Sequence, residues 1–413
     1  MTSMLSDDRT QFEPHCLAAF EDLRVALLEL YHNVGADPET PQDIARRFKV
    51  NKTLTWNVSK VMSATEPLAT VPNVPGGSAL RVLLDAMLRE GASQAAVQRV
   101  RLASEAFDKM IATHVGDRAT LELVLDGMGT DRDDYLEHSR KLAFRGNSGL
   151  WGIQAKTRLM SVFMAPNPTT PQRLDIAIVR GYVGVRRLRT DVRWPLFQLR
   201  GWGDRNDAVT KDRWEPIEES AAGQSPSPVI RSFSTFDSTK LEEVRTPAGL
   251  DFVLTSGPVG NAGSFDCFLA DYARSAVSTF RTATDITGEF GAPISAPTER
   301  LVFDIIVDEQ LDFALSPEVR AYGGVFAGGP EGDAPGSPLP LPLAQSIVAL
   351  PGRPPLVATA SVPRYADIVS LVFQRMGWDP VRFRGCRYEL AYPPLGSTVL
   401  MSFGLPAAPE ASR

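Results

Sequence analysis

Cysteine and histidine are scarce in this chain of 413 residues. The three cysteines, Cys16, Cys267 and Cys386, lie far apart and form no C-x-x-C pair. Such a set provides no disulfide framework and is typical of a reducing compartment. Histidine occurs only four times and never after His138. The C-terminal part can therefore supply neither a Ser-His-Asp or Cys-His catalytic set nor a histidine-ligated zinc.

Long apolar runs and targeting signals are missing as well. No apolar run could span a bilayer, and residues 1–13 lack the basic-then-apolar pattern of a secretory signal. The phosphate-binding pattern G-x-x-x-x-G-K-[ST] does not occur, and the run 131–134 lacks the glycine and closing glutamate of a calcium loop. Asp304 and Asp308 share one face of a predicted strand, where edge protection explains them better than acid–base chemistry. We therefore expect a cytoplasmic protein with no membrane partner, metal or cofactor, and not an enzyme.

The overall composition is that of a globular protein. Apolar residues make up 43% of the chain and charged residues 22%. A chain of 413 residues is too long for one ordinary core, so two or three domains are expected. The formal net charge of -6 argues against wholesale coating of nucleic acid. Any contact with DNA must come from a local basic patch.

Helical spacing of apolar residues gives way to short β-rich runs at the proline-rich segment 165–172, APNPTTPQ. The sequence therefore predicts an α+β protein with an N-terminal all-α region and a C-terminal mixed domain. Its predicted parts are a helix-turn-helix domain at 14–66, a helical region at 67–165 and an α+β domain at 172–406. The last helix of the middle region is capped by Thr130 or Asp131, and its continuation to Met164 is left open. In the C-terminal domain we expect helices at 265–280 and 365–376, and strands at 174–179, 182–188, 196–199, 252–255, 301–307, 384–390 and 398–403.

The most informative stretch is 41–62, PQDIARRFKVNKTLTWNVSKVM, which predicts two short helices with a tight connection. Thr40 is a plausible N-cap of the first helix. Asn51 is a good cap for the second helix, which runs from Lys52 to about Ser63. A buried stripe at helical period is formed in that second helix by Leu54, Val58 and Val61.

Basic residues gather on this helix pair. No acidic residue occurs between Arg46 and Lys60, whereas five basic ones do: Arg46, Arg47, Lys49, Lys52 and Lys60. Steps of about 100° per residue, with the stripe turned inward, place Trp56 near the centre of the outward face. Lys52 and Lys60 lie beside it.

The helix pair resembles the helix-turn-helix of bacterial DNA-binding regulators, whose second helix enters the major groove. The resemblance covers about the first sixth of the chain and rests on Asp43-Ile44-Ala45, on Val50 after the turn and on a Ser/Thr/Asn-rich second helix. It implies double-stranded DNA as the partner, and a homodimer, because such pairs usually read two half-sites. The residues that it assigns to DNA binding are Arg46, Arg47, Lys49, Lys52, Thr53, Trp56, Asn57, Ser59 and Lys60. Among these, lysines and arginines would meet phosphates, while Thr53, Asn57 and Ser59 would reach base edges.

Two departures from the pattern keep a second interpretation open. Lys49 occupies the turn position that glycine usually takes, and a groove-reading helix rarely presents an indole such as that of Trp56. The leading hypothesis is a DNA-binding transcriptional regulator with a C-terminal assembly or sensing domain. The alternative is a structural or protein-interaction protein in which the helix pair is buried or Trp56 anchors a protein contact.

Overall fold

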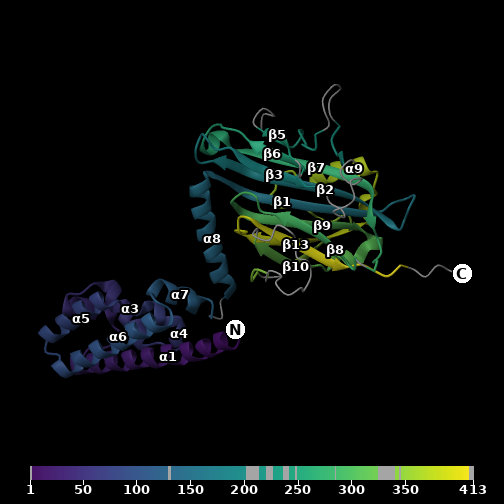
Figure 1. Cartoon of the computed structure of the whole chain (residues 1–413). Coiled ribbons are helices and arrows are strands. Elements are labelled where there is room, and N and C mark those ends of the chain that lie inside the picture. Colours follow the sequence, from purple (N-terminus) through teal and green to yellow (C-terminus); the bar gives the residue numbers. More distant parts are fainter. Residues whose placement is uncertain are drawn as a thin grey trace. The chain divides into compact units, whose positions relative to one another are not determined.

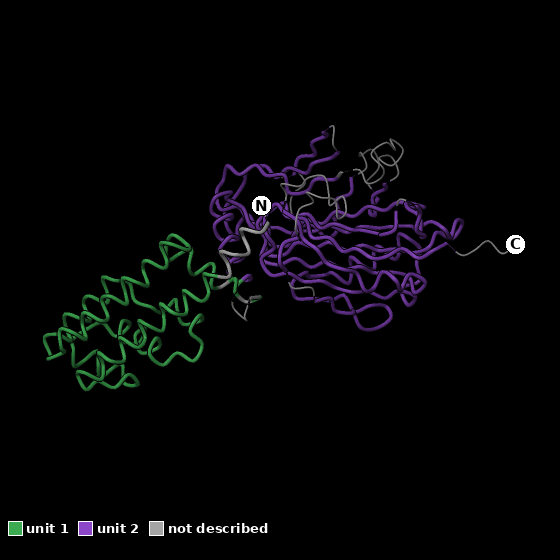
Figure 2. The backbone as a smooth tube through the Cα atoms, turned by 60° about the horizontal axis from the view of Figure 1, so that its bottom comes forward, with its two compact units in different colours: residues 1–135 green, residues 136–413 purple. Residues whose placement is uncertain are grey.

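The structure, a computed structural model, describes residues 2–128, 132–200, 214–219, 227–235, 241–246, 249–283, 285–323, 340–343 and 346–408. The chain folds as two compact units, Met1–Tyr135 and Leu136–Arg413 (Figure 2). About 39% of the residues are helical and 32% are in strands, so the protein belongs to the predicted α+β class. Every described strand lies in the second unit (Figure 1).

Unit 1 consists of helices around a single apolar core. Its elements are α1 (Thr2–Asn33), α2 (Pro41–Phe48), α3 (Lys52–Met62), α4 (Pro67–Thr70), a 3₁₀ turn (Val71–Asn73), α5 (Gly77–Arg89), α6 (Gln94–His114) and α7 (Arg118–Asp126). Side chains from α1, α3, α5 and α6 meet in the core, among them Phe20, Leu27, Val58, Leu83 and Phe107. The helix pair α2–α3 is thus one part of a larger helical unit that extends beyond the predicted boundary at 66.

The chain enters unit 2 through α8 (Arg132–Trp151), which ends earlier than the predicted helical region. Gly152 follows in the left-handed backbone conformation, at φ +71°, which favours glycine. A side chain at this position would in addition collide with Val192. Strand β1 (Ile153–Pro166) then begins, so the helix does not continue to Met164, which the sequence had left open, and the end of the predicted helical region at 165 lies within the strand. Its residues are buried on both faces of a sheet, and such a strand has no alternation that separates it from a buried helix.

Unit 2 is built on a seven-stranded sheet in the order β11-β12-β9-β1-β2-β7-β4. Strand β1 pairs antiparallel with β2 and parallel with β9. The remaining strands of this sheet are β2 (Arg173–Arg187), β4 (Glu215–Pro216), β7 (Phe265–Ser278), β9 (Thr298–Asp308), β11 (Ile347–Leu350) and β12 (Phe383–Ala391). Two three-stranded sheets accompany it: β10-β13-β8 (Glu318–Gly323, Ser397–Gly404, Thr287–Pro293) and β3-β6-β5 (Trp194–Arg200, Gly249–Leu254, Leu241–Thr246).

Both faces of the large sheet are covered. Alternate residues of β1 point to opposite faces: Phe163 packs with α9 (Tyr365–Met376), whereas Val162 joins the core shared with the β10-β13-β8 sheet. A further core, with Tyr182 and Phe252 among its members, joins the large sheet to β3-β6-β5. Figure 1 shows these strands stacked in layers.

Because both faces of the large sheet are buried, a second prediction from the sequence is also wrong. The expected helix at 265–280 is strand β7, because neighbours such as Cys267 and Phe268 are both buried, one on each face. Its apolar spacing therefore mimics a helical face. The two runs predicted at 174–179 and 182–188 form the single strand β2. The predicted helix at 365–376 is confirmed as α9.

Candidate functional site

The helix pair α2–α3 has the predicted bounds and a tight connection. Lys49 adopts the left-handed backbone conformation at φ +55°, and its amide donates to the Ala45 carbonyl. The Asn51 side chain accepts a hydrogen bond from the Thr53 amide at 2.7 Å, as expected of an N-cap. Thr40 makes no such side-chain cap, because its hydroxyl instead donates to the Asp37 carbonyl at 3.2 Å. The turn therefore forms without glycine, with the Lys49 side chain exposed.

Helix α3 has one buried and one exposed face, as its sequence predicts. The stripe of Leu54, Val58 and Val61 is buried in the core of unit 1. Trp56 lies on the opposite face and is 47% exposed, so the packing of unit 1 leaves about half of it open. The burial form of the alternative hypothesis is therefore not supported for Trp56.

The basic side chains of the pair fall into two groups. Lys49, Lys52 and Lys60 are exposed, and none makes an ion pair with any acidic residue in the described ranges. Arg46 pairs with Asp43 at 2.6 Å, but the pair is exposed and surface pairs of this kind are weak. Arg47 donates to backbone carbonyls of the segment before α2 and so has a structural partner.

The polar side chains of α3 also fall into two groups, those without a structural partner and those with one. Thr53 is exposed and Asn57 is half-buried, and neither side chain donates or accepts a hydrogen bond within the described residues, since the cap at Thr53 involves only its backbone amide. The Ser59 hydroxyl donates to the Pro38 carbonyl at 2.7 Å. Ser59 therefore holds the segment before α2, and it reaches outward only if that hydrogen bond is broken.

The unit that carries this face is acidic overall. Residues 1–135 contain 14 Lys and Arg against 20 Asp and Glu, whereas residues 136–413 contain 29 of each. The lysines of α3 and its turn thus form a local basic patch on an acidic unit. Charges farther away than about 8 Å are largely screened at physiological salt, so the local composition dominates at short range.

Unit 2 contains a buried polar cluster that sequence reasoning missed. The Arg387 guanidinium donates to both carboxylate oxygens of Asp304 at 2.8 Å, and the Tyr365 hydroxyl lies 2.8 Å from the same carboxylate. The Ser161 hydroxyl is 2.6 Å from that of Tyr365. Desolvation, and then the Asp304 carboxylate, hold the pKa of Tyr365 well above its usual range. Asp304 lies on a central strand rather than at an edge, so the cluster fastens α9 to the sheet and exposes no reactive group.

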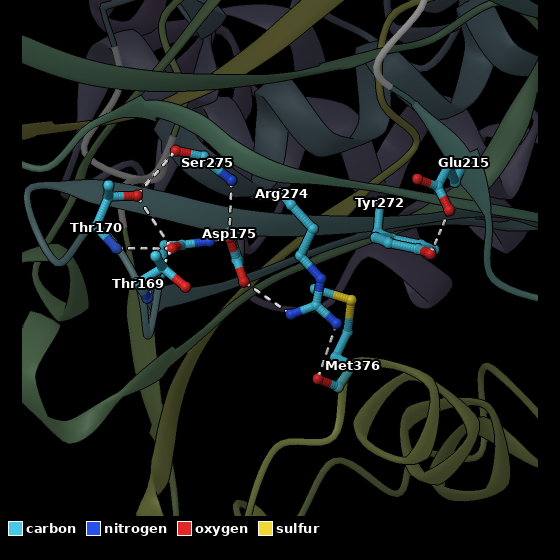
Figure 3. A network of polar contacts seen from close by, with 9 residues as sticks. Thr169, Thr170, Asp175, Glu215, Tyr272, Arg274, Ser275 and Met376 are labelled. Carbon is cyan, nitrogen blue, oxygen red and sulfur yellow. Dashed lines mark hydrogen bonds and ion pairs between the residues drawn. The ribbon is translucent and has the colours of Figure 1, made fainter.

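A second buried carboxylate has a similar structural role. Asp175 accepts a hydrogen bond from the Asn167 side chain at 2.7 Å. It also accepts one from the Ser275 amide at 2.8 Å and pairs with Arg274 at 2.7 Å (Figure 3). Arg274 also donates to the Met376 carbonyl at 3.0 Å. These contacts join the β1–β2 turn to β7 and to the end of α9.

Unit 2 contains a pocket of about 370 Å³ with both polar and apolar side chains in its lining. Thr157, Val183, Arg300 and Ala391 line it and are paired neighbours across β1, β2, β9 and β12. Helix α8 contributes Glu137. No sequence motif marks this pocket, because its residues come together only through the strand order.

Other signatures of function are absent from the part of the chain that the structure describes. It contains no cluster of three or more potential metal ligands. None of its helices combines the length and the apolar character that a bilayer-spanning segment requires. No protein-family model matches the chain, and comparison with curated proteins finds no significant match.

Proposed function

We propose that the protein binds double-stranded DNA through the outward face of α3 and acts as a transcriptional regulator. The observation that carries this proposal is the set of exposed lysines Lys49, Lys52 and Lys60 beside the polar side chains of Thr53 and Asn57. All project from a short connected helix pair whose opposite face is buried. Cationic and amide side chains on one helix are the groups that contact phosphates and base edges.

The roles within this surface follow from the contacts of each residue. Lys52 and Lys60 contact phosphates, while Thr53 and Asn57 reach base edges. Arg46 adds a backbone contact after leaving its weak pair with Asp43. Arg47 and Ser59 keep their partners in the segment before α2 and position the pair, in place of the direct contacts expected from the sequence.

The wider proposal concerns assembly and location. Unit 2 assembles subunits or senses a partner, without enzymatic activity, and a dimer allows two copies of α3 to read two half-sites. A reducing, cytoplasmic setting agrees with the three free cysteines, all of them buried. Sedimentation velocity over a series of micromolar concentrations tests the dimer. A monomer at every concentration of the series would contradict it.

Trp56 provides a direct test of which surface meets DNA. The full chain is titrated with a mixed-sequence duplex while acrylamide, a neutral quencher that DNA does not repel, reports on exposed tryptophan. The chain contains six tryptophans, so the Trp56→Phe variant serves to isolate the signal of Trp56. DNA should protect Trp56 from quenching. Binding without protection, or the absence of binding, would refute the proposal.

The second candidate is a protein-binding surface centred on Trp56. Its support is the 47% exposure of an indole at the middle of the face, since interface hot spots are enriched in tryptophan. The surrounding lysines would then favour an acidic partner. This candidate gains if the quenching experiment shows an accessible Trp56 that DNA leaves unprotected.

A further inference from the structure

The pocket of unit 2 combines charges of both signs in one small space. Its lining includes two carboxylates, Glu137 and Glu299, and two cations, Lys156 and Arg300. Arg300 is paired with Glu389 at 2.9 Å, and Glu299 lies 3.8 Å from Arg186. Two of the four charges are thus already matched by groups around the pocket.

The other two charges have no such partner. Glu137 of α8 and Lys156 of β1 are exposed, and neither makes a hydrogen bond or ion pair with another residue in the described ranges. A purely anionic ligand would leave Glu137 unmatched, and a purely cationic one would leave Lys156 unmatched. A ligand that carries one positive and one negative group complements both.

The rest of the lining limits the size and polarity of such a ligand. Val183, Pro363 and Ala391 supply apolar surface, while Thr157 and Ser361 supply hydroxyl groups. The volume of about 370 Å³ is at the small end of the range for ligand sites. We propose that this pocket binds a free α-amino acid, with its carboxylate at Lys156 and its ammonium group at Glu137.

The position of Glu137 gives binding a structural consequence. Helix α8 is held to the rim of the pocket by Arg140, which donates to the Ala391 carbonyl at 3.1 Å, and by Phe144, whose ring centroid lies 5.5 Å from that of Tyr392. Tyr392 has a backbone φ of +50°, a conformation that residues other than glycine rarely adopt. An amino acid that joins Glu137 to Lys156 adds a further bridge between α8 and β1. Ligand binding therefore fastens α8 to the sheet.

The test uses the full chain and each of the common L-amino acids at millimolar concentration. At least one should raise the thermal midpoint, because a ligand that binds only the folded state stabilises it. The N-acetyl and the carboxamide derivatives of the active amino acid should both fail, since each lacks one charge. The proposal would be overturned if no amino acid raised the thermal midpoint, or if either derivative raised it as much as the free amino acid does.

Two variants locate the site. Lys156→Gln and Glu137→Gln should each weaken binding about tenfold or more, since each removes a charge-assisted hydrogen bond. The matched controls are Arg320→Gln and Glu289→Gln on the β10-β13-β8 sheet, which should bind normally. Amide hydrogen exchange of residues 136–151 should slow with the active amino acid. Equal affinity in all four variants would place the ligand elsewhere and refute this site.

Discussion

Replacing Arg387 by methionine should destabilise unit 2 strongly. The change keeps much of the side-chain volume but removes the two hydrogen bonds to Asp304 and a third, of 2.7 Å, to the Val357 carbonyl. Asp304 is fully buried, so its charge would be left with only the Tyr365 hydroxyl. Breaking a buried ion pair typically costs 3–5 kcal/mol. The Arg387 side chain is 11% exposed, so we expect about 3 kcal/mol, at the lower end of that range.

The loss should also depend on pH. Burial raises the pKa of the Asp304 carboxyl, and Arg387 opposes that rise. Without Arg387, the pKa of the Asp304 carboxyl in the folded state lies further above its value in the unfolded state. A raised folded-state pKa stabilises the fold at low pH, and that contribution is lost as the pH rises through it. The deficit of Arg387→Met relative to the wild type should therefore be smaller at about pH 5 than at about pH 8.

Urea unfolding of the full chain, followed by far-UV circular dichroism, measures both effects. The matched control is Arg320→Met, which breaks an exposed pair with Glu318 and should cost less than about 1 kcal/mol. Adding Asp304→Asn to Arg387→Met should recover part of the loss, because it removes the unpaired charge. A loss in Arg387→Met no larger than that of the control, or one that grows as the pH falls, would refute the role given to this cluster.

Three further predictions concern other parts of the molecule. Asn57→Ala should weaken binding at the preferred DNA site by about 1–3 kcal/mol and relax specificity there, with little change in thermal stability; unfolding of the variant would contradict this. Gly181→Ala should cost about 1–3 kcal/mol in urea unfolding, because the new methyl group meets the Phe268 ring in a filled core; a neutral result would contradict the packing. Burial raises the pKa of Cys16 to about 11 and that of Cys386 to about 12, which reduces the thiolate fraction at neutral pH. All three thiols should resist Ellman's reagent in the native protein and react in denaturant, whereas rapid native reaction would show that a thiol is accessible.

The helix pair was predictable because its signals are local. The Asn51 cap, the Leu54 and Val58 stripe and the outward position of Trp56 all follow from neighbours within a few residues in the sequence. The partners of Arg47 and Ser59 were not predictable in this way. They are backbone carbonyls of the segment before α2, and their position depends on how that segment folds back.

Unit 2 was harder to predict, since its structure depends on contacts that are distant in sequence. Strand β1 is buried on both faces, so its apolar run has no period that identifies a strand. The structural role of Asp304 depends on its contacts with Arg387 of β12 and Tyr365 of α9, which are distant in sequence. The pocket likewise depends on the strand order. The sequence therefore predicted the class of this unit and several of its elements but neither of these two groups of residues.

The salt dependence of DNA affinity tests the proposed role of α3 most directly. Fluorescence anisotropy with a labelled duplex gives the Kd of the full chain over a series of salt concentrations. The comparison is between Lys52→Ala/Lys60→Ala and Arg81→Ala/Lys109→Ala, which removes the same charge from exposed positions on α5 and α6. The α3 variant should bind every duplex more weakly. The magnitude of the negative slope of log K against log salt should decrease by about two units, one for each lost phosphate contact. Equal affinities and slopes in the two variants would contradict DNA binding by α3.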